Sequence, residues 1–463
     1  MAITNASTMN VADPTSASTP PLKGGGLQLT PQNYVALADL IDPTKPDVRD
    51  LYVSTYGDQG ITGFLELTGA KKTAGTSDKV EWYEEGRLHK TVTFTGLENS
   101  VFTVADNDPV VVRLNDVLLL SSGVKVVVTD EDTNGTTFTV ANLDGSALAD
   151  LDTPNSGTAA IIGNIYGQGS DQPSAFYQTG LVRRENPYII TKEMYEVSGS
   201  QATNIGYLNV NGQYMWYLKN EMDARKKFMN QREMMLLYSE IADGTLGPVS
   251  VGTDSKIVGS QGYFSAVEER GITAQVSGGA QGSFASMSDI DTILLELDKE
   301  GAPAEYAMYV NRATSLDIDD MLANGIATQV TAGLAGQFGA FNNDADLAVQ
   351  LGFKSFTRGG YTFHKHDWKL LNDPTLGGLN NIHKGAMVPM SQVADASSGI
   401  KSPALEMNFK SAGNYSREME HWVTGGGVLG YTNAANGKDT AIFNYRSECN
   451  LVTRAANQHV VLK

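Results

Sequence analysis

Cysteine is nearly absent from this sequence. Cys449 is the only one among 463 residues, which excludes an internal disulfide framework. We expect Cys449 to be a small buried hydrophobic residue rather than a reactive thiol. Basic residues are also scarce, with 34 Lys and Arg against 52 Asp and Glu and a formal charge of −18. A chain with this balance repels nucleic acid on average, which argues against a sequence-specific DNA-binding protein.

Long apolar runs are missing as well. The longest, residues 110–120, is interrupted by Arg113, Asn115 and Asp116, so we expect no segment to span a bilayer. Residues 1–5 have neither a charged region nor an apolar core, and they do not resemble a signal peptide. These features predict synthesis in the cytoplasm and no membrane partner.

Catalytic motifs are absent too. The sequence contains no P-loop, no dinucleotide signature after a strand, no G-x-S-x-G elbow and no H-E-x-x-H motif. His364 and His366 could place two imidazoles on one strand face, but zinc requires three or four ligands and no partner set is evident. We therefore expect solvated strand histidines, no metal site, no cofactor and no enzyme activity.

One stretch has to be weighed for calcium binding. Residues 130–135, Asp-Glu-Asp-Thr-Asn-Gly, copy the start of an EF-hand loop. The twelfth position should supply a bidentate Glu but is Ala141, and the flanking pattern is typical of strands rather than helices. Our interpretation is a hairpin turn with Asn134 and Gly135 at its tip. Calcium binding by Asp130–Asn134 is the alternative.

The strongest helix signal covers residues 213–241, which contain no Gly or Pro. At 1.5 Å per residue the predicted helix would be roughly 40 Å long. Apolar residues that recur at helical spacing predict a buried stripe, and further apolar residues line its flank. The stripe consists of Tyr214, Leu218, Met222, Met229 and Leu236, and the flank of Tyr217, Ala224, Phe228 and Met235.

An extended approach precedes this helix. Residues 185–200 contain the β-favouring Tyr188, Ile190 and Val197 and close on Val-Ser-Gly-Ser. An extended arm, a corner of this type and a long polar-faced helix together resemble the major capsid proteins of tailed bacteriophages. The resemblance implies the Hong Kong 97-type capsid fold, an α+β fold whose long spine helix crosses the subunit. The implied parts are an N-arm at 1–50, an E-loop and its base at 51–90 and 166–200, a P domain at 201–285 and 404–463 that includes the spine helix at 213–241, and an A domain at 286–403.

The N-terminal composition is typical of an arm. Residues 1–30 are rich in Ser, Thr, Ala, Pro and Gly, and alone they cannot bury enough apolar surface to fold. Thr30 and Pro31 have the pattern of a helix N-terminus, which predicts a short helix at 32–41.

Two stretches of opposite charge carry paired aromatic residues. Residues 80–90 are acidic and residues 175–185 contain two adjacent arginines, a pattern that favours facing antiparallel strands. We interpret the stretches as the sides of one long hairpin, the counterpart of the E-loop; two unrelated strands are the alternative. Adjacent arginines should face opposite sides of a strand, so one can pair with Glu84 or Glu85 while the other meets a neighbouring subunit. The candidate contact residues between subunits are Trp82, Tyr83, Glu84, Glu85, Arg87, Tyr177, Arg183 and Arg184.

Short β runs separated by turn signals lie between these two stretches. Their spacing of about ten residues predicts a β-barrel or sandwich, and thus a small all-β domain inserted at 91–165. Loop tips accept inserted domains, and a domain at the tip of the E-loop would be displayed on the outer face of a shell. The runs are 91–94, 101–104, 110–114, 117–120, 124–128 and 136–140.

Residues 286–403 alternate between helix and strand signals. A helix capped by Ser288 or Asp289 should be followed by a strand at 305–310, a second helix at 316–322 and a hairpin at 351–363. The first helix should bury Ile290, Ile293, Leu294 and Leu297, and the hairpin should turn at Gly359 and Gly360. Residues 241–285 are expected to form strands and loops, 327–344 the loop near a local symmetry axis, and 404–463 a β-rich return.

The resemblance also implies a function. It predicts a structural virion protein, the major capsid subunit, which self-assembles as pentamers and hexamers into an icosahedral shell. Such a shell contacts a portal and other capsid proteins and encloses packaged double-stranded DNA without sequence-specific binding. The protein would be made in the host bacterial cytoplasm and end in the virion. The alternatives are a β-rich tail or baseplate subunit, and a carbohydrate- or surface-binding module that uses the β insertion.

Overall fold

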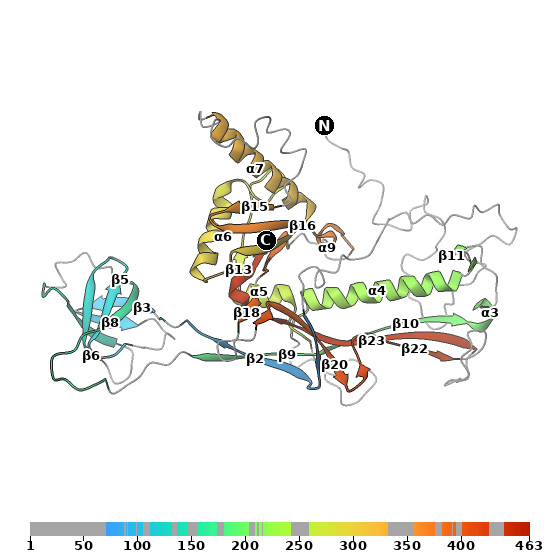
Figure 1. The fold of residues 1–463 in the computed structure, drawn as a ribbon, viewed down its shortest axis with the longest axis horizontal. Coiled ribbons are helices and arrows are strands. Elements are labelled where there is room, and N and C mark those ends of the chain that lie inside the picture. The colour runs from blue at the N-terminus through green and yellow to red at the C-terminus, as the bar shows by residue number, and fades with distance from the viewer. Residues whose placement is uncertain are drawn as a thin grey trace. The chain divides into compact units, whose positions relative to one another are not determined.

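The computed structural model describes the chain from residue 71 onward, with gaps at residues 88, 90, 99, 105–111, 132–136, 147–155, 174–179, 203–208, 211–212, 215, 242–258, 332–354, 376–381, 391, 395–400 and 426–438. The predicted N-arm and the helix at 32–41 lie outside the described residues, as do Tyr177 and most of the predicted loop at 327–344. The chain divides into two units, one formed by residues 82–184 and the other by the remainder (Figure 1).

The larger unit contains a first sheet whose strands run in the order β1-β20-β23-β10. Two short strands extend it, β21 on β20 and β22 on β23. Every pairing is antiparallel except β1 with β20. The strands are β1 (Lys71–Gly75), β10 (Ile189–Ser198), β20 (Leu405–Ala412), β21 (Tyr415–Ser416), β22 (Glu420–Gly425) and β23 (Thr440–Thr453).

Helix α4 (Trp216–Tyr238) lies along β10 and β23 on one face of this sheet (Figure 1). It confirms the predicted long helix but begins three residues later. Gln213 and Tyr214 form β12 (Gln213–Tyr214), because their backbone pairs with β11 (Asn209–Val210). Phe228, only 1% exposed, packs against Tyr445 of β23 with ring centroids 5.9 Å apart.

The predicted buried stripe of α4 is partly wrong. Met222 and Met229 are 51% and 43% exposed, whereas Leu236 is buried. Met235, placed on the flank, is 41% exposed as well. Residues seven apart lie on nearly the same side of a helix, so spacing alone cannot separate Leu236 from the two methionines. The difference comes from α5 (Tyr263–Arg270), which contacts α4 and shares a core with Leu236.

A second sheet in the same unit has the order β13-β24-β17-β14-β16-β15. Helices α6 and α7 contribute to the core on one face and α5 to the core on the other. The elements are β13 (Ile272–Ala274), β14 (Glu305–Val310), β15 (Ser355–Arg358), β16 (Tyr361–Asp367), β17 (Gly385–Pro389), β24 (Val460–Leu462), α6 (Met287–Lys299) and α7 (Arg312–Thr331). Short elements complete the unit: α3 (Gly199–Ala202), α9 (Lys369–Asn372), β18 (Gln392–Ala394), β19 (Lys401–Pro403) and η3 (Ala456–Gln458).

Several local predictions in this sheet are confirmed. Strand β14 has the predicted bounds, and the four apolar residues named for α6 are buried. The hairpin β15–β16 turns at Gly359 and Gly360, whose φ values of 58° and 87° suit glycine. The cap of α6 is Ser286 rather than Ser288 or Asp289, because Asp289 accepts a hydrogen bond from the Ser286 backbone N–H at 3.1 Å.

Other predictions need correction. Helix α7 is longer than the predicted 316–322. Asn311 caps its N-terminus, because the Asn311 side chain accepts a hydrogen bond from the Thr314 backbone N–H at 2.7 Å. Helix α5 falls in 241–285, where only strands and loops were expected. Strands β13 and β24 fall within the predicted P domain, and they pair in the same sheet as β14 of the predicted A domain.

The smaller unit contains a closed barrel in the order β3-β4-β7-β6-β5-β8. Phe102 lies between Phe94 and Phe138 in its interior, with ring centroids 4.5 and 5.3 Å apart. The strands are β3 (Thr91–Glu98), β4 (Val101–Val104), β5 (Asp116–Leu120), β6 (Lys125–Glu131), β7 (Thr137–Asn142) and β8 (Gly157–Asn164).

The strands of the barrel differ from the predicted runs in two places. The run predicted at 110–114 is not a strand in its described part, because the chain turns at Asn115 with a φ of 69°. Strand β8 was not predicted.

The calcium-like stretch begins at the end of β6, and its residues 132–135 lie outside the described residues. Strands β6 and β7 pair antiparallel around it, as the hairpin interpretation requires.

We predict that Phe228→Ala lowers the free energy of unfolding by about 3 to 5 kcal/mol, because it leaves a cavity between α4 and β23. Met229→Ala, at the next and 43% exposed position, should change it by about 0.5 kcal/mol or less. Chemical denaturation of both variants measures the difference. Similar losses from the two changes would show that the buried face of α4 is wrong.

We also predict that residues 91–165 fold when expressed alone. The six strands close on one another, and the barrel has its own apolar core. A two-dimensional NMR spectrum of this fragment should therefore show dispersed amide resonances. Collapsed resonances would mean that the barrel depends on the rest of the chain.

Candidate assembly surfaces

The predicted facing strands form a two-stranded ribbon, β2 (Lys79–Glu85) with β9 (Leu181–Pro187). The pairing extends beyond the strands, since the Gly86 N–H donates to the Gly180 carbonyl oxygen at 3.0 Å. Arg87 follows the end of β2 and is exposed. The two stretches are therefore facing strands of one hairpin, and the alternative of unrelated strands is wrong.

The two faces of the ribbon carry separate ion pairs. On one face Glu84 Oε2 lies 3.5 Å from Arg184 Nε, and Trp82 Nε1 donates to Glu84 Oε1 at 3.0 Å. On the other face Lys79 Nζ lies 2.6 Å from Glu185 and 2.8 Å from Glu81. Arg184 thus has the partner that the sequence predicts. Arg183, its neighbour, belongs to the opposite face by strand alternation.

Apolar side chains on the ribbon are largely uncovered. Tyr83 and Leu181 are each 66% exposed and Val182 is 44% exposed. A two-stranded hairpin is at best marginally stable on its own. The exposed residues of this ribbon, with its acidic and basic groups, make it the first candidate assembly surface.

The root of the ribbon is held by one buried side chain. Asn186 is 1% exposed and uses both ends of its amide. Its Nδ2 donates to the carbonyl oxygens of Leu451 at 2.7 Å and Gln261 at 2.9 Å. Its Oδ1 accepts from the Gln261 N–H at 2.8 Å and the Ser260 hydroxyl at 3.0 Å. Four hydrogen bonds satisfy the amide fully, so β9 is tied firmly to β23 and to the segment before α5.

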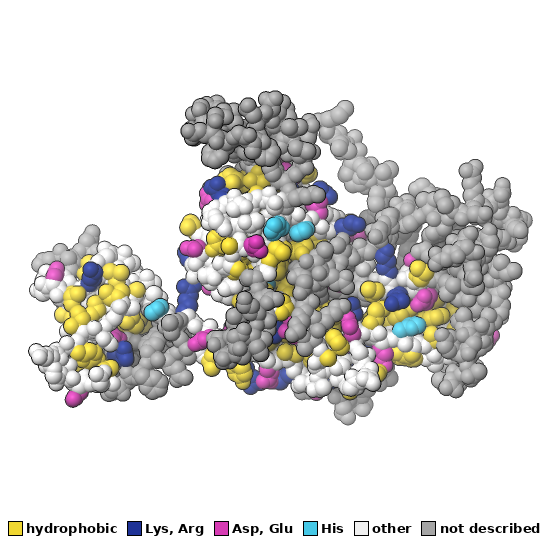
Figure 2. Space-filling model, viewed as in Figure 1, with side chains coloured by type: hydrophobic (Ala, Val, Ile, Leu, Met, Phe, Trp, Pro, Cys, Tyr) yellow, Lys and Arg dark blue, Asp and Glu magenta, His cyan; other side chains and the backbone are white. Residues whose placement is uncertain are grey.

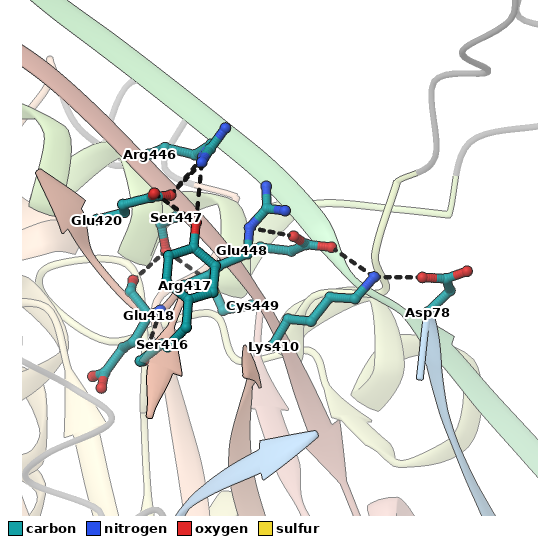
Figure 3. A network of polar contacts seen from close by, with 11 residues as sticks. Asp78, Lys410, Ser416, Arg417, Glu418, Glu420, Arg446, Ser447, Glu448 and Cys449 are labelled. Atoms are coloured by element: carbon teal, nitrogen blue, oxygen red, sulfur yellow. Dashed lines mark hydrogen bonds and ion pairs between the residues drawn. The ribbon is translucent and has the colours of Figure 1, made fainter. Parts of the chain in front are cut away.

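An ion-pair chain lies beside this root (Figure 3). Lys410 of β20 pairs with Asp78, just before β2, and lies 3.3 Å from Glu448 of β23. Glu448 is 5% exposed and also lies 2.8 Å from Arg417 Nε. A buried carboxylate is costly unless it is paired, and two cations compensate this one. No local sequence pattern predicts these pairs, because their members are far apart in the chain.

A second polar cluster occupies the sheet face opposite α4 (Figure 3). Arg446 of β23 lies 2.5 Å from Glu420 of β22, and the Tyr415 hydroxyl donates to Glu420 at 2.5 Å. The Arg446 guanidinium also lies over the Trp422 ring, 5.0 Å from its centroid. Partial burial raises the pKa of Glu420, but the hydrogen bonds from Tyr415 and Arg446 outweigh it and lower that pKa overall. Glu420 therefore stays ionised and holds the cluster together.

Exposed apolar residues flank this cluster. Trp422 is 40% exposed, and Ile190 and Met194 of β10 are 53% and 49% exposed. Exposed apolar side chains also occur elsewhere on the described surface, where Figure 2 shows them among charged groups. This sheet face is the second candidate assembly surface.

Cys449 and His366, the side chains weighed above as a reactive thiol and a metal ligand, pack against other residues of the fold. Cys449 is fully buried, and burial raises the pKa of its thiol. Burial lowers the pKa of His366, whose ring stacks on Tyr309 at 5.2 Å. Among the described residues, no group of three or more His, Cys, Asp or Glu side chains is placed to hold a metal ion. No helix in the same residues is long and apolar enough to cross a membrane.

His459 is a further buried titratable group, and its pKa is strongly lowered. Its side chain is fully buried, and its Nδ1 lies 3.2 Å from the hydroxyl of Tyr263. Burial holds its pKa at about 3, against an ordinary 6.5. The folded protein therefore keeps this imidazole neutral across the usual pH range.

No protein-family model and no curated protein matches the chain. It is similar to several solved structures from phages and from a GTA particle. A structure from Mycobacterium phage Adephagia has a TM-score of 0.40 and 9% identity, covering 90% of this chain and 94% of that chain. The capsid structure of cyanophage P-SCSP1u has a TM-score of 0.42 and 8% identity, covering 90% and 92%. A capsid of a native GTA particle has a TM-score of 0.35 and 11% identity, covering 97% and 98%.

We predict that His459→Gln flattens the dependence of stability on pH. The imidazole of His459 is protonated below about pH 6.5 in the unfolded chain but only below about pH 3 in the folded chain. The unfolded chain therefore binds an additional proton between these pH values, and the free energy of unfolding decreases as the pH falls through this window. One such proton contributes about 1.4 kcal/mol per pH unit. Urea unfolding between pH 7 and pH 4 should give a smaller slope for the variant than for the parent. His89→Gln, a change at an exposed position, is the control for loss of a histidine. Equal slopes for the parent and His459→Gln would contradict the prediction.

Proposed function

We propose that this chain is the major capsid subunit of a tailed bacteriophage, with a Hong Kong 97-type arrangement and a β-barrel inserted in its E-loop. The observation that carries the proposal is the β2–β9 ribbon. It exposes large apolar side chains at Tyr83 and Leu181, has only two strands, and is anchored at its root by the buried Asn186. A ribbon that is fixed at one end and uncovered along its length is suited to lie across another subunit.

The proposed mechanism is geometric. Covering the ribbon by a neighbouring subunit removes its apolar surface from water, at about 25 cal/mol per Å². The contact is heterologous, with the ribbon of one subunit on a different surface of the next, and repetition of such a contact closes a ring. Pentamers and hexamers of an icosahedral shell are rings of this kind. The subunit would join them in the host cytoplasm and remain in the virion.

The charges of the ribbon support this role. Arg184 is compensated within the hairpin by Glu84 at 3.5 Å. Arg183 belongs to the opposite face, where it contributes to the contact between subunits in this proposal. A single exposed ion pair is worth only about 0.2 to 1 kcal/mol. A shell repeats each contact many times, so weak pairs still favour correct assembly.

The remaining partners follow from the same role. The shell would contact a portal and other capsid proteins and would enclose packaged DNA. A formal charge of −18 keeps the wall from adhering to DNA on average, although salt screens this repulsion beyond roughly 8 Å. The barrel interior is filled by Phe94, Phe102 and Phe138, which supports a displayed structural insertion rather than a ligand-binding cavity.

Negative-stain electron microscopy of the protein expressed alone, and with the other capsid proteins, tests the proposal. Closed shells are the expected result. Tubes or open rings would favour the tail or baseplate subunit. Monomers whose barrel binds a glycan array would favour the surface-binding module, and either result would overturn the capsid role.

We predict that Leu181→Ser raises the protein concentration needed for assembly and leaves the melting temperature almost unchanged, because this side chain is 66% exposed in the subunit and is covered only in the shell. Leu143→Ser, the same change at a 44% exposed position on the barrel, should not affect assembly. Light scattering against concentration measures the threshold. The ribbon has no assembly role if both variants assemble as the parent does.

A further inference from the structure

Two methionines on helix α4 are exposed on the side of the helix that is turned away from its sheet. Met222 and Met229 are 51% and 43% exposed, and residues seven apart lie on nearly the same side of a helix. Phe228 packs on β23 and Lys227 lies 4.0 Å from Glu193 of β10. At 3.6 residues per turn, both methionines fall on the side opposite to these contacts.

The next position of the same stripe shows what kind of element covers it. Leu236 follows Met229 by one further heptad, and it is buried in a core that it shares with α5. Helix α5 contacts α4 directly. A helix therefore packs on this side of α4 near its C-terminal end, whereas the same stripe is uncovered at Met222 and Met229.

A cation lies within the uncovered part of the stripe. Arg225 is exposed and falls between the two methionines on the helix surface, three residues after Met222 and four before Met229. Among the described residues it forms no ion pair. A surface of this composition suits a partner that is apolar and acidic, because methionine adapts to apolar side chains and arginine pairs with carboxylates.

The N-terminal segment has this composition. Residues 32–42 lie outside the described residues, and their sequence predicts a helix over 32–41. Asp39 and Asp42 are the only charged residues of the segment. An isolated helix of this length is marginal in water, so its apolar stripe needs a surface to pack on. That stripe, at helical spacing, consists of Tyr34, Leu37, Ala38 and Ile41.

We propose that residues 32–42 bind as a helix to α4 of the same chain, on its stripe of exposed methionines. The apolar side of the segment covers Met222 and Met229, and Asp42 pairs with Arg225. The segment lies next to α5 and continues the cover that α5 gives to Leu236. Two helices then occupy the side of α4 that the sheet leaves free.

The length of the intervening chain allows this contact. Residues 43–70 connect the segment to β1, which pairs with β20 in the sheet that α4 covers. A flexible linker of this length spans roughly 30 Å on average and at most roughly 90 Å. A tether of this kind gives an effective concentration in the millimolar range, so the segment binds α4 of its own chain before that of a second copy in dilute solution.

The proposal concerns the unassembled subunit and does not rest on the capsid role. A terminal segment that is held by one small patch opens without unfolding the rest of the chain. Met229→Ala therefore weakens the docking of the segment, although it changes the free energy of global unfolding little.

Disulfide cross-linking of the full chain tests the contact. Leu37→Cys combined with Met222→Cys or with Met229→Cys should form an intrachain disulfide under mild oxidation, detected by mass spectrometry after proteolysis. Cys449 is fully buried, so a disulfide between the two introduced cysteines can be assigned. The reduced variants should melt as the parent does, which shows that the body of the subunit is intact.

The matched control uses another methionine of the same helix. Met235 is 41% exposed and lies about 120° around α4 from Met229. Leu37→Cys combined with Met235→Cys has the same tether but the wrong side of the helix. The faster of the two test pairs should form its disulfide about tenfold faster than this control.

A charge exchange tests the ion pair independently. Arg225→Asp should speed hydrogen exchange at the backbone amides of residues 32–42 by about threefold, the loss expected for one exposed ion pair. Asp42→Arg combined with Arg225→Asp should restore the slower exchange of the parent. Lys125→Asp, the same change of charge at an exposed lysine of the barrel, should leave exchange in the segment unaltered.

The outcomes separate the docking from the capsid role. Equal rates of cross-linking at the three methionines, or amides at 32–42 that exchange as fast as in a free peptide of that sequence, overturn the docking. A disulfide that joins two chains in dilute solution overturns docking within one chain. Shells from a protein without the intrachain cross-link leave the capsid role intact, whereas a cross-linked subunit that forms no shells in its reduced state supports the docking and overturns the capsid role.

Discussion

The pairing of β23 is the constraint on which the larger unit depends. This strand has 14 residues and pairs with β10 on one side and with β20 and β22 on the other. The chain then continues through η3 into β24, which belongs to the second sheet. One continuous segment therefore contributes to both sheets, and a slip of one residue in β23 would turn its buried face outward.

The two faces of β23 divide packing from polar contacts. Phe443, Tyr445 and Cys449 enter the cores beneath α4 and α5. Arg446 and Glu448, at the alternate positions, carry the ion pairs of the other face. A buried pair contributes little net stability, since desolvation opposes attraction, but removal of one partner is costly. The ion pairs on the polar side of β23 therefore favour one strand register over the others, and they add little to the free energy of unfolding.

Features with a local cause could be predicted from the sequence, and features with a distant cause could not. Helix α6 and the β15–β16 hairpin follow from nearby caps, apolar spacing and glycines, and they were predicted with small errors at the ends. The Arg184–Glu84 pair was also predictable, because each member belongs to a charged run flanked by aromatic residues.

The errors concern features whose cause lies far away in the sequence. Leu236 and Met229 share one side of α4, but only the part near Leu236 is covered by α5. Helix α5 has eight residues and too little length for a clear period. Asn186 gave no signal, because its hydrogen-bond partners lie 75 and 265 residues further along the chain. The buried anchor of the candidate surface was thus missed, whereas the exposed charges on it were found.

The contrast between anchor and ribbon explains how a marginal hairpin can serve assembly. The four hydrogen bonds of Asn186 are made within the folded subunit, so they do not depend on a partner. They reduce the freedom of β9 at its root, and a preorganised segment loses less entropy when it binds. The apolar residues beyond the root, Tyr83 and Leu181, gain burial only in a complex. Folding of the subunit thus orders the root of the ribbon. In the proposed shell, association with a neighbouring subunit buries the apolar side chains that two strands cannot bury alone.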